Sequence, residues 1–167
     1  MRTLTLLFGL LVLPLAASPA LGQAASETDI VTATLNVAPM AKLNLSALTL
    51  TFPDTNPDFA ALVPASGGPL VVTARARATP ATLVTLTVQA LDDLRSGTDV
   101  IPAAAVRWTA SGDGFADGTL SAAAAQNVAT WPASGAYTGR LAFVFDNSWN
   151  WPTGTYTVTL VFTLTAL

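Results

Sequence analysis

The stretch Gly154–Ala166 reads GTYTVTLVFTLTA and indicates the fold class of this protein. Apolar side chains recur at every second position for most of its length, and threonine occupies most of the positions between them. Successive side chains of a strand point to opposite faces, so one face of this segment is apolar and the other carries hydroxyl groups. The stretch therefore predicts a half-buried antiparallel strand.

The same alternation recurs from Asp29 onward, interrupted at short intervals by Gly, Pro, Asp and Asn. It predicts further strands over Ile30–Val37, Leu43–Phe52, Leu70–Arg77, Val84–Gln89, Val106–Ala110 and Leu141–Phe145. A phase slip at Ser46-Ala47 predicts a bulge or a crossing between sheets. Only Ser121–Gln126 favours helix, for one turn at most. We expect an all-β, immunoglobulin-like antiparallel β-sandwich of about seven to eight strands, without the usual disulfide.

The N-terminus has the layout of a secretory signal peptide: Arg2, then the apolar run Leu4–Ala17, then small residues before Ala25. We expect residues 1–24 to be removed and residues 25–167 to form one domain. The protein is then secreted to the extracellular space or the cell surface, with the periplasm as a further option. The C-terminus has no apolar span, so no transmembrane anchor is expected.

Composition excludes most of the common catalytic groups. The sequence has no histidine and no cysteine, which removes histidine general bases, serine–histidine–aspartate triads, thiolate nucleophiles and metal sites built on those residues. Seven basic residues face ten acidic ones, a net charge of −3, which disfavours nucleic acid as a partner. We expect neither enzymatic activity nor a cofactor.

Two acidic turns carry oxygen ligands at short spacing. Asp54 and Asp58 lie in one turn, and Asp113 and Asp117 lie in the other. Calcium prefers such ligands, although neither turn matches a twelve-residue calcium loop. Aspartate is also an ordinary turn residue, and this second interpretation is the one we favour.

Trp149 and Trp151 flank Asn150 beside a Pro-Gly turn. On a strand, residues two positions apart share a face, so the pair could form a platform for sugar rings. The alternative is that Trp108 and one of this pair fill or cover the core, as large aromatic side chains usually do.

The closing stretch resembles the last strand of WxL-type bacterial cell-surface domains, which ends in a Gly-x-Tyr strand leading to Trp-x-Leu. Here Phe162-Thr163-Leu164 occupies the place of that motif, with phenylalanine instead of tryptophan. The order of Val84–Leu91, Trp131 and Leu141–Phe145 upstream is also similar. The resemblance implies a cell-wall glycan or peptidoglycan-binding module, with Phe162 and Leu164 in its motif.

A broader likeness is to secreted sandwich subunits that build surface fibres by donating a strand. It rests on the cysteine-free sandwich and on an alternating N-terminal segment whose apolar positions are Val31, Ala33, Leu35 and Val37. Our first hypothesis is a structural protein whose partner is a second copy, in an oligomer or filament formed by strand addition. The alternative is a module whose partner is a cell-wall polysaccharide.

Overall fold

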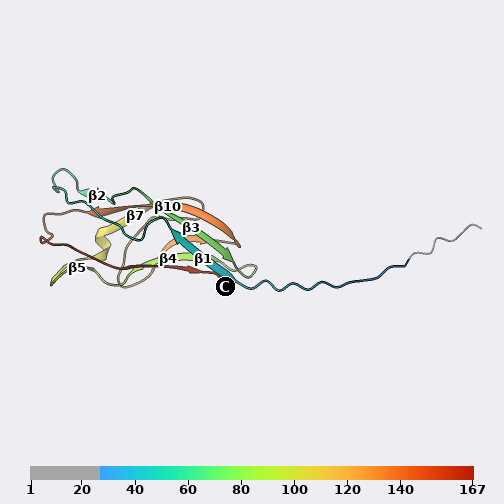
Figure 1. Ribbon diagram of the computed structural model, residues 1–167. Coiled ribbons are helices and arrows are strands. Elements are labelled where there is room, and N and C mark those ends of the chain that lie inside the picture. The colour runs from blue at the N-terminus through green and yellow to red at the C-terminus, as the bar shows by residue number, and fades with distance from the viewer. Residues whose placement is uncertain (1–26) are drawn as a thin grey trace, which may run out of the picture. The chain divides into compact units, whose positions relative to one another are not determined.

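A computed structural model describes residues 27–167 of the protein (Figure 1). The predicted signal peptide lies outside the described residues. Residues 36–167 form one structural unit, and residues 27–35 belong to a separate N-terminal unit. Residues 27–39 form no strand or helix. The strand expected over Ile30–Val37 is therefore absent from the single chain, because a strand needs a neighbour to satisfy its backbone groups.

The chain forms an all-β sandwich of antiparallel sheets, as predicted. Six strands make the larger sheet: β1 (Met40–Leu45), β2 (Leu62–Pro64), β3 (Leu70–Arg77), β7 (Val106–Ser111), β8 (Gly118–Thr119) and β10 (Gly135–Asp146). The main path through this sheet is β1-β3-β10-β7-β8, and β2 pairs with the end of β10.

The smaller sheet has three strands in the order β11-β4-β9, namely β11 (Leu160–Thr165), β4 (Val84–Ala90) and β9 (Gln126–Trp131). A separate hairpin pairs β5 (Leu94–Ser96) with β6 (Asp99–Ile101), and one 3-10 turn, η1 (Ala103–Ala105), leads into β7. Figure 1 shows β3, β7 and β10 on one side of the sandwich and β4 on the other. Of the eleven strands that the structure describes in residues 27–167, seven have six or more residues and the other four have two or three.

The core lies between the central strands of the two sheets. In β4 every second residue is fully buried, and in β3 the same alternation buries four side chains almost completely; these residues are Val84, Leu86, Val88, Ala90, Leu70, Val72, Ala74 and Ala76. The threonine and arginine positions between them face outward. Period-two alternation thus builds the core, as the sequence predicts.

The phase slip at Ser46 marks the end of β1. Ser46 donates its N–H to the carbonyl of Val71, at 2.9 Å, and its Oγ accepts the N–H of Val71. The chain then bends and stays beside the larger sheet, where Thr51 accepts a hydrogen bond from Ser66. The slip is therefore a strand terminus, and the chain does not cross between sheets at this point.

Candidate functional site

The two long sides of the sandwich are closed to different extents. On one side, which we call the closed side, the segment 112–120, which contains β8, joins β9 of the smaller sheet to β7 of the larger one. Ala116 donates a hydrogen bond to Val128 of β9, and Leu120 donates one to Val106 of β7, both at 2.9 Å. The backbone of both sheets is therefore linked by hydrogen bonds along this side.

Aromatic side chains fill the interior of the closed side. Trp108 is almost fully buried, and its Nε1 donates to the carbonyl of Ala116 at 2.9 Å. Trp131 is equally buried and stacks on Tyr137, with ring centroids 4.4 Å apart. Gly118 permits this packing, since a Cβ at that position would come within 2.2 Å of the Trp108 ring.

The opposite side, which we call the open side, is bounded by the edge strands β1 and β11. These two strands lie against each other near the C-terminus (Figure 1), but they belong to different sheets and do not pair. Their inward side chains are only half-buried, although those of the adjacent strands β3 and β4 are almost fully buried; the half-buried residues are Leu43, Leu45, Leu160, Phe162 and Leu164. Apolar surface thus remains accessible along the open side.

The backbone of the edge strand β11 is available along the open side. Leu91 donates a hydrogen bond to the carbonyl of Thr159, the residue directly before β11. This bond shows which residues of β11 turn their backbone groups toward β4. In an antiparallel ladder only every second residue turns its backbone groups toward a given neighbour. The backbone groups of Leu160, Phe162 and Leu164 therefore point away from β4, toward the open side.

The segment that carries Val31, Ala33, Leu35 and Val37 is apolar at alternate positions and forms no strand, so its backbone groups are also available for pairing. Val31, Leu35 and Val37 are 90%, 85% and 55% exposed. From Ile30 to Ala41 the sequence has no charged residue. An uncharged stretch of alternating apolar residues without a pairing partner can enter a sheet without burying a charge.

The two tryptophans of the predicted sugar platform are separated by a turn. Trp151 donates its N–H to the carbonyl of Ser148, and its Nε1 donates to the carbonyl of Asp146 at 2.9 Å, so its half-buried ring packs against the core. Trp149 is 68% exposed, and its Nε1 donates to Asp58 Oδ1 at 3.0 Å. The pair does not share a strand face, because residues 147–152 leave β10 and form this turn.

The neighbour of Trp149 in space is a loop that the sequence did not connect with it. Asn147 donates from Nδ2 to the carbonyls of Thr55, at 2.8 Å, and Ala60, at 3.2 Å. These bonds hold the loop that carries Phe59, which is 90% exposed. The sequence of this loop, which is rich in proline and aspartate, does not predict the contact, because the partner residue Asn147 lies some ninety residues away in the chain.

The four calcium candidates lie in two separate loops. Asp58 Oδ1 accepts the indole Nε1–H of Trp149, and Asp117 Oδ1 accepts the backbone N–H of Ala110 at 2.6 Å. Asp113 contributes its backbone carbonyl to Trp131 Nε1, and Asp54 is exposed. Over residues 27–167 no three acidic, histidine or cysteine side chains gather as a metal site would require.

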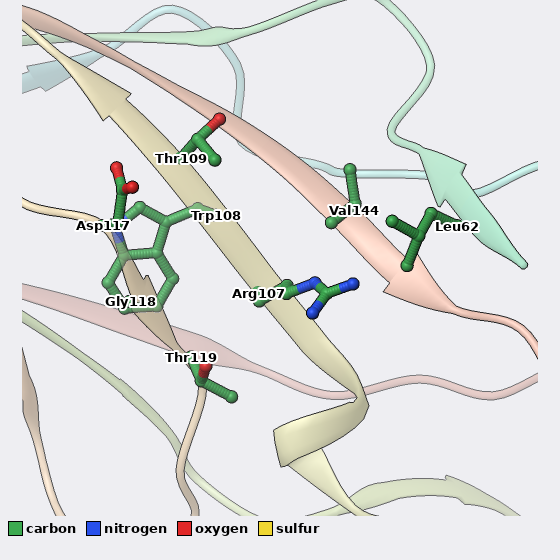
Figure 2. A pocket seen from close by; sticks show the side chains of 8 residues that line it. All are labelled: Leu62, Arg107, Trp108, Thr109, Asp117, Gly118, Thr119 and Val144. Carbon is green, nitrogen blue, oxygen red and sulfur yellow. The ribbon is translucent and has the colours of Figure 1, made fainter.

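The surface also carries a shallow hollow of about 560 Å³ over β7, β8 and β10 (Figure 2). Arg107, Thr109, Asp117 and Val144 line it, and the Trp108 ring forms part of it beside Gly118. Arg107 Nη2 forms an ion pair with Asp146 Oδ1 at 3.1 Å, although the two atoms do not have hydrogen-bond geometry. Asp117 Oδ1 accepts a hydrogen bond from the backbone N–H of Ala110. Both charged side chains of the hollow therefore already have partners within the fold.

The pKa values that shift belong to the exposed pair Asp92 and Arg95 and to the half-buried Tyr156. A hydrogen bond from Arg95 lowers the pKa of Asp92, with a smaller contribution from the N–H of Asp93. Desolvation raises the pKa of Tyr156.

No family model matches the sequence, and no curated protein matches it significantly. No helix in the part of the chain from Glu27 to Leu167 is long and apolar enough to cross a bilayer.

Proposed function

We propose that this chain is an exported, non-catalytic structural protein of the cell surface or extracellular space, which assembles with copies of itself by strand addition. The observation that carries the proposal is the coexistence of a half-buried, unpaired sheet edge with a strand-like segment that has no partner. An edge of this kind is a template for pairing with another chain. Strand addition satisfies the backbone groups of both parts.

The exposed apolar side chains of the segment favour self-association, because pairing with another chain would remove them from water. Val31, Leu35 and Val37 expose most of their side chains. Each such side chain contributes about 1.5–3 kcal/mol when it becomes fully buried. Assembly of identical copies would bury several of them at every junction.

The experiment compares the assembly of two charge variants of the complete chain. Leu35→Asp places a carboxylate on the apolar face of the segment, and Thr34→Asp places the same charge on the opposite face. Light scattering and electron microscopy should show filaments or large oligomers for the wild type and for Thr34→Asp, and single particles for Leu35→Asp. A wild-type protein that stays monomeric at high concentration contradicts the proposal.

The second candidate is a module that binds cell-wall glycan, through the exposed ring of Trp149. Asp58 holds this indole in place, and Phe59 is exposed beside Asp58 on the same loop. Flat, rigid aromatic surfaces with a polar neighbour suit sugar rings. The likeness of the closing strand to WxL-type domains also favours a peptidoglycan ligand, although Phe162 and Leu164 are half-buried against the core.

Sedimentation with purified peptidoglycan tests the second candidate. Trp149→Ala should abolish cosedimentation, because it removes the exposed ring. Leu48→Ala is the matched control, since Leu48 is also exposed but lies outside this loop pair. Equal cosedimentation of the wild type and of Trp149→Ala would exclude this ring from a role in binding.

A further inference from the structure

On the open side, the smaller sheet has one strand fewer than the larger sheet. The larger sheet extends from β10 through β3 to β1, whereas the smaller sheet extends from β4 only to β11. The edge strand β11 lies against β1 without pairing with it, and the inward side chains of β1, Leu43 and Leu45, stay half-buried. A strand added beside β11 would extend the smaller sheet next to these half-buried side chains.

We infer that the segment Val31–Val37 of a second copy occupies this position, paired with β11 as the fourth strand of the smaller sheet. The inference rests on the proposed self-assembly and specifies its receptor. The apolar side chains of the donated segment would face Leu43, Leu45 and Phe162. Its threonines and Asn36 would face solvent, as Thr163 of β11 does.

The strands β1, β8, β9 and β11, which end the main paths of the two larger sheets, differ in how they are protected, and this difference selects β11. The edge of β9 is hydrogen-bonded to the segment 112–120, and β8 has only two residues. The edge strand β1 contains Lys42 and is directly preceded by Pro39. A lysine or a proline at a sheet edge disfavours pairing with a further strand. From Gly154 to Leu167 the chain has no charged residue, and β11 contains no proline and pairs in unbroken register. β11 is therefore the edge best suited to receive a strand.

The donated segment fits this edge in length and polarity. At about 3.3 Å per residue, the seven residues Val31–Val37 span about 23 Å and the six residues of β11 about 20 Å. Neither strand carries a charge, so their pairing buries no ion. The donor and receptor surfaces are different parts of the molecule, so each copy can donate to one neighbour and receive from another. Such head-to-tail contacts generate a ring or an open filament.

Disulfide cross-linking tests the receptor, because the native sequence has no cysteine. Three double variants of the complete chain carry Thr34→Cys in the donor segment. The second cysteine replaces Thr163 on β11, Asn44 on β1 or Asn127 on β9, all on outward faces. Variants with Thr32→Cys or Asn36→Cys in place of Thr34→Cys allow for other registers. Directly opposed residues of neighbouring strands come close enough for a disulfide.

After mild oxidation, a non-reducing gel should show a ladder of multimers for the Thr163 series, at least tenfold more intense than for the Asn127 series. A ladder in the Asn44 series alone would overturn the receptor assignment while leaving self-assembly intact. An internal disulfide in monomers of the Thr163 series would show that the segment folds onto its own chain, which also overturns the inference. Chains that neither assemble nor cross-link would contradict the proposed function itself.

Discussion

The closed and open sides of the sandwich contain similar apolar strands, but only one of them is sealed within the chain. On the closed side, the segment 112–120 bonds to both sheets, and Trp108 and Trp131 are almost fully buried. On the open side, β1 and β11 lie together without pairing, and Leu45 and Phe162 remain half-buried. The two sides differ in which strands and segments cover the apolar side chains, and this difference, more than the hydrophobicity of those side chains, decides how deeply each side of the core is buried. The following predictions test that difference, starting with the largest effect.

Trp108→Ala should produce the largest loss of stability. It creates a cavity in the closed side and removes the hydrogen bond from Nε1 to Ala116, so we expect the free energy of unfolding to fall by about 3–5 kcal/mol. Denaturant unfolding monitored by circular dichroism measures it. A loss below about 1 kcal/mol would show that this side is not tightly packed.

Phe162→Ala should cost less, about 1–2 kcal/mol, because the ring is only half-buried in a single chain. The measurement uses the Leu35→Asp background, which keeps the chains apart under our proposal. If Phe162→Ala costs as much as Trp108→Ala in that background, the open side is already closed in the monomer.

Asp117→Ala should cost about 0.5–1.5 kcal/mol, since it removes the acceptor of the Ala110 N–H at the edge of the closed side. Asn44→Ala on the outward face of β1 is the control. It should change the free energy of unfolding by less than about 0.5 kcal/mol. Equal effects of the two variants would mean that this bond contributes nothing specific to the closed side.

The smallest effect concerns the exposed pair Asp92 and Arg95, which belongs to neither side. The hydrogen bond from Arg95 lowers the pKa of Asp92 in the folded state, so its stabilising contribution is present above the ordinary aspartate pKa. That contribution is lost as pH falls through the lowered folded-state value. Arg95→Gln should slightly reduce the acid-induced fall of the unfolding midpoint below about pH 4. An identical pH dependence in both proteins would show that the pair has no effect.

The sequence predicted the central strands well and the edges less well. Leu70–Arg77 forms β3 as expected, because strict alternation specifies both the strand and its buried face. β9 was missed, since Val128 and Ala129 are consecutive buried residues beside an irregularity in the pairing with β4, and four alanines precede the strand. Alternation in Gly154–Ala166 overestimated the length of β11, which spans Leu160–Thr165. Before it, Thr157 forms only an isolated antiparallel bridge with Arg95.

The candidate site depended on information that alternation does not contain. The pattern identified the segment Val31–Val37 as strand-like, but pairing is a property of two strands, and the receiving edge emerges only from the order of strands in both sheets. Likewise, the turn at Ser148–Trp151 separates Trp149 from Trp151, and its long-range bonds to the Asp58 loop left no local sequence signal.

The most direct test of strand addition is hydrogen exchange at the backbone amides of Leu160, Phe162 and Leu164. The account predicts that these amides exchange rapidly in Leu35→Asp and slowly in the assembled wild-type protein, because the donated strand would then accept their N–H groups. Equally rapid exchange of the three amides in the assembled wild-type protein would contradict it.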